Sequence, residues 1–380
     1  MKKLLYITNI PAPYRQKRFN IMAQVFPKYG IDFEVLYMAK IEPNRKWEIL
    51  NDSYNYKHTF FKGIHPTIKG FFAHFNPSLL FRLMKDDYDI AIVGGMSSPT
   101  HWLAPFFISK DKVQVMSVES NLHSVERKTG IGFKIKKKLL SKANAYQITG
   151  NPQKKYIEYF YPESVSKKFI RLPNIIDEEV FKEEVENLKH DRLNLRKNFN
   201  VSEKVQMWVL PARLISIKGI LPFLDLIKEI EGIKLFILGE GELAEEILDF
   251  IKLHKLPVHL VGFVQQNDVI KYYAAADLFV LPSLKDPSPL SPIEAIASGL
   301  PILVSSRIGN LEDVLDENEN GWCYDPKGEL SYAKSLIKKI VALTNEELQT
   351  KGKKSSLVYK KVFDSEACIN SYAKELQKVL

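Results

Sequence analysis

An acidic pair with seven residues between its members stands in the part of the sequence that is richest in possible chemistry. Asp286 and Glu294 lie in the stretch 281–304, where an apolar run, a proline-rich loop and a helical pattern follow one another. Pro292 is suited to the first turn of a helix, so we expect Glu294 to lie in that turn. The Glu294 carboxylate can then accept two hydrogen bonds from vicinal hydroxyls such as those of a ribose, beside backbone N–H groups that favour a phosphate.

Each member of the pair also has a purely structural explanation. A carboxylate in the first turn of a helix complements the helix dipole, and aspartate is a common turn residue. Taken alone, neither Asp286 nor Glu294 indicates a ligand. The case for a ligand depends on the residues that accompany them.

Two basic residues and two glycines lie earlier in the sequence than Asp286 and Glu294, and each of these two sets comes directly after an apolar run. Arg213 and Lys218 come after the run 207–211, and Gly239 and Gly241 come after the next such run. The glycines lack the third glycine of the dinucleotide-binding fingerprint. Ligands of open α/β sheets bind at the carboxyl ends of the strands. We therefore expect these four residues to lie together at the carboxyl edge of one sheet.

In this order and spacing, the segments resemble the C-terminal domain of the family 4 retaining glycosyltransferases (glycosyl transferase group 1), of the kind that builds bacterial surface polysaccharides. The resemblance runs from about Trp208 to Val304 and contains Arg-x4-Lys-Gly, Gly-x-Gly, Ala-Asp-x4-Pro-Ser and acidic-x7-Glu elements, the last being the most specific. The first acidic residue of the family's signature is Glu, whereas this chain has Asp286, which reaches less far toward a donor sugar. The segment 172–177 resembles the family's Pro-Asn-Gly-Val-Asp interdomain segment.

The resemblance implies a retaining glycosyltransferase of the GT-B fold, with two Rossmann-like doubly wound α/β domains facing each other across a cleft. The C-terminal domain would bind a nucleotide-diphosphate sugar, most commonly a UDP-sugar, without a cofactor or a metal ion. Arg213 and Lys218 would neutralise the leaving diphosphate. Glu294 would hold the ribose, and Asp286 the hydroxyls of the donor sugar. The substrate-binding residues that the resemblance adds in this half and at its boundary are Asn174, Gly239, Gly241, Phe263, Val264, Pro289, Leu290 and Ser291.

The N-terminal half matches the family more loosely, as an acceptor-binding domain. Pro13 and Tyr14 lie in an opening loop that resembles that of the surface-polysaccharide relatives, although a proline-stiffened turn also explains them. Many relatives carry a histidine that contacts the sugar in one of two later loops, but a lone histidine is more often structural. The candidates in these two loops are Gly94, Gly95, Ser97 and His101 in the first, and Glu119 and His123 in the second.

A chain of 380 residues is longer than a single hydrophobic core usually accommodates. Apolar runs separated by helical patterns indicate parallel sheets, so we expect two doubly wound domains. The acceptor domain is assigned to residues 1–177, joined by a returning C-terminal helix at 365–380, and the nucleotide-sugar domain to residues 178–364, which open with a charged segment, 178–200. The expected strands are 4–8, 32–37, 56–61, 90–93, 113–118, 146–149 and 169–172, followed by 207–211, 234–238, 259–261, 278–281 and 302–304.

The net charge of +9 is concentrated in residues 1–177, where basic residues outnumber acidic ones two to one. One helical segment, Arg127–Lys142, is basic and partly apolar, which suits anionic lipid headgroups or a lipid-pyrophosphate acceptor. A solvated charged helix explains the segment equally well. Nucleic acid ranks below both because no known binding motif accompanies the charge. The basic residues of the segment are Arg127, Lys128, Lys134, Lys136, Lys137, Lys138 and Lys142.

The small number of cysteines and the hydropathy of the chain indicate the cellular compartment in which we expect the protein. Cys323 and Cys368 cannot form a disulfide framework, which favours a reducing environment. The apolar run Leu4–Ile7 is too short for a signal peptide, and no uncharged apolar stretch is long enough to span a membrane. We therefore expect a cytoplasmic protein that associates at most peripherally with the inner face of the plasma membrane.

The predicted function is transfer of a hexose-type sugar from a nucleotide-diphosphate sugar to a glycan, or to a polyprenyl- or lipid-linked acceptor, in surface polysaccharide, lipopolysaccharide or capsule biosynthesis. A nucleotide-sugar epimerase or a sugar phosphorylase with a similar twin-domain fold remains an alternative. A non-enzymatic sugar-binding protein is a third class, but it would not need Arg213, Lys218 and Glu294 around one site. A nicotinamide dehydrogenase is least favoured because neither half has Gly-x-Gly-x-x-Gly after its first strand.

Overall fold

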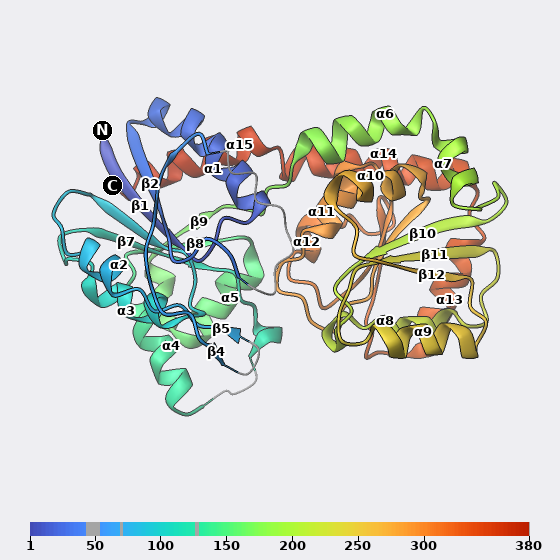
Figure 1. The fold of residues 1–380 in the computed structure, drawn as a ribbon, viewed down its shortest axis with the longest axis horizontal. Helices are drawn as coiled ribbons and strands as arrows, with labels where there is room; N and C mark the ends of the chain where they lie inside the picture. The colour runs from blue at the N-terminus through green and yellow to red at the C-terminus, as the bar shows by residue number, and fades with distance from the viewer. Residues whose placement is uncertain (43–53, 69–70, 126–128, 380) are drawn as a thin grey trace. The chain divides into compact units, whose positions relative to one another are not determined.

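The computed structural model describes residues 1–42, 54–68, 71–125 and 129–379. The chain divides into two compact units, which we call unit 1 (residues 1–175 and 365–380) and unit 2 (residues 176–364) (Figure 1). The division falls two residues before the boundary expected after Asp177. The reason is packing, since Ile175 lies in the core of unit 1 and Ile176 in the core of unit 2.

Unit 1 is built on a seven-stranded sheet in which each pair of neighbours is parallel. Across the sheet the strands are β3 (Lys57–Phe60), β2 (Ile31–Tyr37), β1 (Lys2–Thr8), β6 (Ile90–Val93), β7 (Val113–Val118), β8 (Ala145–Ile148) and β9 (Lys168–Arg171). The strand order reverses between β1 and β6. The loops that follow these two strands therefore diverge and leave room for a ligand at the carboxyl edge of the sheet.

Strand β1 shows why the central strands are almost continuously apolar. Leu4 and Tyr6 pack into the cluster on one face of the sheet, and Leu5 and Ile7 pack into the cluster on the other. Successive side chains of a strand point to opposite faces, so a sheet covered on both faces needs apolar residues at every position. The first face is covered by α1 (Pro13–Val25) and α15 (Ser365–Gln377), and the second by α2 (Pro77–Arg82), α3 (Pro99–Phe107), α4 (Ile131–Lys142) and α5 (Asn151–Phe160).

Unit 2 repeats this plan with a six-stranded parallel sheet. Its strands are β12 (Val258–Gly262), β11 (Ile233–Leu238), β10 (Gln206–Pro211), β13 (Leu278–Leu281), β14 (Ile302–Ser305) and β15 (Gly321–Tyr324) in spatial order. The order reverses between β10 and β13, and open α/β sheets bind ligands at the carboxyl edge beside such a reversal. None of the helices within the described ranges combines the length and the apolarity needed to cross a bilayer.

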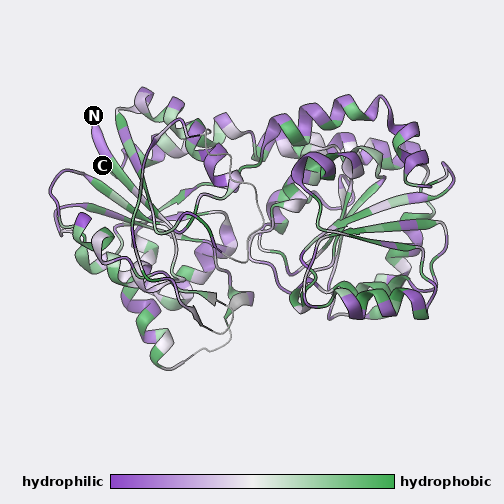
Figure 2. Ribbon diagram, in the orientation of Figure 1, coloured by the Kyte–Doolittle hydropathy of each residue, from purple (hydrophilic) through white to green (hydrophobic). Residues whose placement is uncertain are grey.

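Helices cover both faces of the sheet of unit 2. One face packs against α8 (Ile220–Ile227), α9 (Ala244–Leu253) and α13 (Leu330–Val341). The other packs against α6 (Val185–Lys189), α7 (Arg192–Asn198), α10 (Gln266–Ala275), α11 (Ser291–Ala297) and α14 (Asn345–Val362). In both units the strands are hydrophobic and the helices carry hydrophilic residues (Figure 2). This pattern is the reason that strands could be predicted from apolar runs.

Helix α3 was not expected, because the sequence reading treated the region around His101 as a loop. The helix begins at Pro99 and contains Pro105 in its interior. It buries Ala104, but Trp102 and Phe106 on its outer face are exposed. The helix therefore lacks the polar outer face by which an amphipathic helix is recognised.

No secondary structure was predicted for the charged segment 178–200, and strand β15 was not among the expected strands. The segment is helical, forming the π-helix η4 (Glu179–Glu184) and then α6 and α7. Phe181 and Val185 are buried in the core of unit 2, so a few apolar residues anchor an otherwise charged stretch. Strand β15 consists of Gly-Trp-Cys-Tyr and opens with glycine, a residue depleted in strands. The antiparallel pair β4 (Thr67–Ile68) and β5 (Phe71–Phe72), with two residues in each strand, was not predicted either.

The C-terminal helix α15 returns to unit 1 and completes its core. Ile369, Tyr372 and Leu376 are fully buried in the same cluster as the central strands. The Tyr372 hydroxyl donates a hydrogen bond to Gln147 Oε1 at 2.6 Å, which ties the helix to β8. Packing of this helix is therefore part of the stability of unit 1.

Replacing Ile369 by Ala should lower the free energy of unfolding of unit 1 by about 2–5 kcal/mol, because the change leaves a cavity beneath α15. The loss is measured by urea unfolding. Lys374→Ala, on the exposed side of the same helix, is the control and should leave the midpoint almost unchanged. Equal effects of the two substitutions would contradict the packing of α15.

Candidate functional site

The loops after β10 and β13 bring two of the expected residues into direct contact. Lys218 follows β10, Asp286 follows β13, and the Lys218 ammonium forms an ion pair with the Asp286 carboxylate. Their side chains are only 15% and 11% exposed. The sequence predicted that both residues line one site, and the structure shows that in this site they are also each other's partner.

Backbone contacts fix the positions of these two loops. Gly219 has a φ of +66°, and a Cβ at this position would lie 2.4 Å from the Pro282 carbonyl oxygen. The N–H of Leu284 donates to the Ile217 carbonyl oxygen at 2.8 Å. On the other side, Asp286 is anchored by its own backbone, since its carbonyl accepts a hydrogen bond of 2.8 Å from the N–H of Gly309. The ion pair is therefore held by main-chain geometry rather than by flexible side chains alone.

Gly239 and Gly241 support the loop that carries Arg213. A Cβ on Gly239 would lie 2.0 Å from the Ala212 carbonyl oxygen, and one on Gly241 would lie 2.3 Å from that of Leu214. Only glycine permits so close a backbone approach. The two glycines thus have a packing role, and they hold the exposed Arg213 at the carboxyl end of β10.

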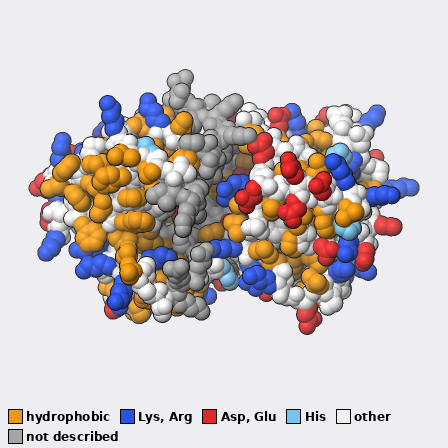
Figure 3. Space-filling view, turned by 60° about the horizontal axis from the view of Figure 1, so that its bottom comes forward, with side chains coloured by type: hydrophobic (Ala, Val, Ile, Leu, Met, Phe, Trp, Pro, Cys, Tyr) orange, Lys and Arg blue, Asp and Glu red, His pale blue; other side chains and the backbone are white. Residues whose placement is uncertain are grey.

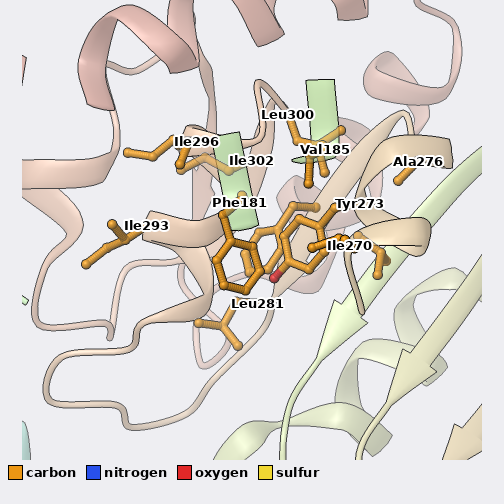
Figure 4. Close-up of a cluster of buried hydrophobic side chains, with 14 of the residues drawn as sticks. Phe181, Val185, Ile270, Tyr273, Ala276, Leu281, Ile293, Ile296, Leu300 and Ile302 are labelled. Atoms are coloured by element: carbon orange, nitrogen blue, oxygen red, sulfur yellow. The ribbon is translucent and has the colours of Figure 1, made fainter. Parts of the chain in front are cut away.

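Glu294 lies on α11, partly buried, and is held by a tyrosine from the neighbouring helix. The Tyr273 hydroxyl donates a hydrogen bond to Glu294 Oε2 at 3.3 Å. Burial raises the pKa of Glu294 to about 7, although the hydrogen bond from Tyr273 acts in the opposite direction. Tyr273 itself is fully buried and packs edge-on against Phe181 at a centroid distance of 5.7 Å. Figure 4 shows Tyr273 within this cluster of apolar side chains.

The segment between Asp286 and Glu294 is held by a buried asparagine that sequence analysis did not identify. Asn310 Nδ2 donates to the Pro289 carbonyl oxygen at 2.9 Å. Leu290 and Ser291 continue from there into the start of α11 and are partly buried. Asn310 is polar and buried, but it lies outside every motif quoted above, so only a contact between residues distant in sequence identifies it.

The remaining candidates of unit 2, and Asn174, lie farther along the sheet edges. Phe263 and Val264 follow β12, the edge strand, with Phe263 39% exposed and Val264 packed against the core. Asn174 is buried just beyond β9, the edge strand of unit 1. Phe263 and Val264 thus follow a strand that is two positions from β10 in the sheet.

Two glycines of unit 1 pack closely at the reversal of its strand order. A Cβ on Gly94 would lie 2.3 Å from the Ile7 carbonyl oxygen, and Gly95 has a φ of +145°. Ser97 is exposed in the same loop. Pro13 and Tyr14 open helix α1, which follows the loop after β1. These residues therefore surround the carboxyl ends of β1 and β6.

His101 belongs to the first turn of α3 and is 1% exposed, which corrects its expected place in an open loop. Its Nδ1 lies 3.1 Å from Ser98 Oγ. Burial, together with the charge of Arg15 and the proximity of His74, lowers the pKa of His101 to about 3, so the ring is neutral. Its buried Nε2 has no hydrogen-bond partner within the described part of the chain.

Arg15, the residue after Tyr14, is a functional candidate that sequence analysis did not select. Its guanidinium donates to Thr8 Oγ1 at 2.8 Å and to Asn9 Oδ1 at 2.5 Å, and its Nη2 lies 3.6 Å from Glu119 Oε1. Glu119 is thus placed with Arg15 at the carboxyl edge of the sheet. His123 is exposed on a short 3-10 turn after β7.

Part of the basic segment Arg127–Lys142 can be placed. Arg127 and Lys128 lie outside the described residues, and the lysines from Lys134 onward lie on α4. Lys136 Nζ lies 4.8 Å from the centroid of the Phe160 ring, and Lys137 pairs with Glu163 at 3.2 Å. Lys134, Lys138 and Lys142 are exposed on the same helix.

Comparison with known proteins gives a family for unit 2. Residues 191–355 match the family model described as glycosyl transferases group 1. The chain is 32% identical to an uncharacterized glycosyltransferase of Methanocaldococcus jannaschii, over 38% of each chain. It is 24% identical to an N-acetyl-alpha-D-glucosaminyl L-malate synthase of Bacillus anthracis, over 52% of this chain and 51% of the relative. A lipopolysaccharide 1,2-N-acetylglucosaminetransferase of Salmonella typhimurium is 25% identical over 54% of this chain and 56% of its own length. The chain thus spans between about a third and a little over half of these relatives.

Solved structures match over the full length at lower identity. Sucrose-phosphate synthase from Thermosynechococcus elongatus has a TM-score of 0.72 and 17% identity, covering 100% of this chain and 99% of its own. HepE of Anabaena, solved with UDP and glucose, has a TM-score of 0.74 and 16% identity, with 100% of both chains covered. Matches at this identity concern the fold. The chain therefore has the two parallel-sheet α/β units of the GT-B glycosyltransferases and carries a glycosyl transferases group 1 domain in unit 2.

Proposed function

We propose that the chain is a retaining glycosyltransferase that moves a hexose-type sugar from a UDP-sugar to a hydroxyl of a glycan or lipid-linked acceptor. The observation that carries the proposal is the grouping of Lys218, Asp286 and Glu294 around the reversal of strand order in unit 2. The functions of relatives support it, since these include a lipopolysaccharide 1,2-N-acetylglucosaminetransferase and a galactosyltransferase that uses a diphosphoundecaprenol acceptor. Surface polysaccharide, lipopolysaccharide or capsule biosynthesis is the setting that we infer.

The chemistry requires negative charge to be stabilised on the leaving group. The bond between the anomeric carbon and the β-phosphate oxygen breaks, and its electrons leave with the nucleoside diphosphate. The acceptor oxygen bonds to the anomeric carbon, and the proton of the acceptor hydroxyl passes to the departing phosphate oxygen. Stabilising charge that develops during this step is the largest contribution that fixed cations can make. We assign this role to Arg213 and Lys218, without a metal ion.

The ion pair of Lys218 with Asp286 affects how strongly the site binds the intact donor compared with the released UDP. Lys218 can reach a diphosphate only by leaving or sharing Asp286. A partly buried carboxylate that loses its cation is destabilised. The hydroxyls of a donor sugar can replace that cation as hydrogen-bond donors to Asp286, whereas UDP alone offers none at this position. The pair should therefore favour the intact donor over the released UDP.

A surface of unit 1 suits a membrane-bound acceptor. We define the α3–α4 face by Trp102, Phe106, Ile131, Lys134, Ile135, Lys138 and Lys142. Its four apolar side chains are between 44% and 79% exposed, and Lys142 Nζ lies 5.1 Å from the centroid of the Phe106 ring, which places the two helices side by side. Figure 3 shows hydrophobic side chains gathered on unit 1 with cations around them.

Aromatic and aliphatic side chains that alternate with lysines are typical of helices that lie in the interface of an anionic bilayer. Each lysine near such a surface contributes about 1 kcal/mol to binding. We therefore infer that the α3–α4 face docks on anionic lipid, which would place the protein peripherally on the inner face of the plasma membrane.

Donor binding is tested by thermal unfolding with UDP-, GDP- and ADP-glucose. The melting temperature should rise with one nucleotide, because ligand at 100 times its Kd adds about 2.7 kcal/mol to the stability of the folded state. UDP alone should give a smaller rise than UDP-glucose, and EDTA should change neither. Lys218→Met should abolish the rise, whereas Lys228→Met, which replaces an exposed lysine directly after α8, should retain it. A rise that survives in Lys218→Met would contradict the assigned site.

The pKa of Glu294 predicts a pH dependence of donor binding. A protonated carboxyl accepts hydrogen bonds from ribose hydroxyls less well than a carboxylate, so affinity should fall as the pH drops through about 7. If only the ionised form binds, the Kd for UDP-glucose should rise about tenfold for each pH unit below that value. Isothermal titration between pH 5 and pH 8 measures the slope. Glu294→Gln should bind weakly and without this slope, and an unchanged slope in that variant would exclude Glu294 as its source.

Vesicle binding tests the α3–α4 face. Charge reversal of Lys134, Lys138 and Lys142 to Glu should weaken binding to phosphatidylglycerol vesicles by more than tenfold, from the loss of about 1 kcal/mol per lysine. Co-sedimentation measures the bound fraction. The charge-matched control reverses three exposed lysines of α14, Lys353, Lys360 and Lys361. Equal loss in both variants would show a general charge effect and contradict docking through this face.

A further inference from the structure

A chain of three side chains in unit 1 lies outside everything assigned so far. His74 Nε2 lies 3.0 Å from Glu42 Oε1, and His74 Nδ1 lies 2.9 Å from Nδ1 of His65. The His74 side chain is 3% exposed and that of Glu42 is 12% exposed, whereas His65 is exposed. The chain therefore runs from a buried carboxylate, through a buried imidazole, to an imidazole at the surface.

The chemistry of the three groups sets the direction of the hydrogen bonds. An ionised carboxylate only accepts, so His74 Nε2 must carry the proton that it donates to Glu42. In its neutral form the His74 ring has one N–H, so its Nδ1 accepts, and the donor is then Nδ1–H of His65. A neutral His65 with its proton on Nδ1 has a bare lone pair on Nε2. Burial is the largest cause of the lowered pKa of His65, which favours a neutral ring near pH 7.

The backbone holds the two histidines in register. Ile64 and Phe75 exchange backbone hydrogen bonds of 2.9 and 3.0 Å, so the residues next to His65 and His74 are paired. The His74 carbonyl also accepts hydrogen bonds from the N–H and the hydroxyl of Thr100, at 3.0 and 2.9 Å. The two rings are therefore set by main-chain contacts on both sides.

The chain is joined to the carboxyl edge of the sheet. Asn9, which follows β1, donates from Nδ2 to Glu42 Oε1 at 2.9 Å and accepts from Arg15 at its Oδ1. Asn9 and Glu42 thus link His65 to the edge where Arg15 and Glu119 lie. This is the edge at which open α/β sheets bind ligands.

We propose that the lone pair on His65 Nε2 accepts a hydrogen bond from a hydroxyl of the glycan acceptor, with Glu42 and His74 as positioning residues. This proposal rests on the proposed function of the chain and assigns part of its acceptor site. Hydrogen bonds in a chain polarise one another, so the carboxylate of Glu42 strengthens the acceptor at the far end. The site selects donors such as sugar hydroxyls, because no proton of His65 points outward.

The state of His65 is tested without any substrate by 15N-correlated NMR of the imidazole rings. His65 should be the Nδ1–H tautomer and His74 the Nε2–H tautomer. Both tautomers should persist from pH 7 to pH 8. In Glu42→Gln, an amide can donate as well as accept, so His65 should lose its single tautomer. An Nε2–H tautomer for His65 in the wild-type chain, as a protonated His74 would impose, would overturn the proposal.

Binding is tested by titrating methyl glycosides of glucose, galactose, mannose and N-acetylglucosamine into the same sample. One of them should shift the His65 Nε2 resonance. His65→Ala should then bind that glycoside about tenfold more weakly, the loss of one hydrogen bond. The control is His190→Ala, an exposed histidine of unit 2, which should bind as the wild type does. No shift with any glycoside, or equal affinities of the two variants, would overturn the proposal.

The proposed function is separated from this inference by the donor. Both histidine variants should keep the stabilisation by UDP-glucose, because His65 lies in unit 1 and the donor residues in unit 2. If the wild-type chain binds no nucleotide sugar, the proposed function fails. If it binds one and His65→Ala has unchanged glycoside affinity, only the inference fails.

Discussion

The reversal of strand order between β10 and β13 is the constraint on which the rest of the account depends. All six strands of unit 2 are parallel, so every loop at their carboxyl ends opens toward the same edge. At the reversal, the loops after β10 and β13 come together, with Gly219 close to the Pro282 carbonyl and Leu284 hydrogen-bonded to Ile217. Lys218 and Asp286 form their ion pair where the two loops meet. Unit 1 repeats the arrangement between β1 and β6, where Arg15, Glu119 and buried His101 gather.

Some polar groups at these edges are buried in a way that does not stabilise the folded chain. Glu294 has a raised pKa because of its burial, and its tyrosine partner is itself embedded in the apolar core of unit 2. The buried Nε2 of His101 has no partner in the described chain. A rigid core beneath such groups keeps them available for a ligand. Parallel strands that are covered on both faces therefore give a site a rigid support.

Much of this arrangement could be predicted from the sequence. The strands were predictable because burial on both faces makes them continuously apolar, and the spacing of Asp286 and Glu294 was readable because both belong to one loop and helix. Helix α3 was missed because its outer face is apolar. The ion pair of Lys218 with Asp286, and the chain from Glu42 to His65, join residues far apart in sequence. No periodic pattern records such contacts, which exist only once the loops are folded.

Hydrogen exchange measured with and without UDP-glucose tests the central claim most directly. The account predicts that the donor slows amide exchange in the loops 212–219, 239–243 and 282–294, with little change at the opposite ends of the same strands. Protection confined to those opposite ends, or spread evenly over unit 2, would contradict a donor site at the reversal of the strand order.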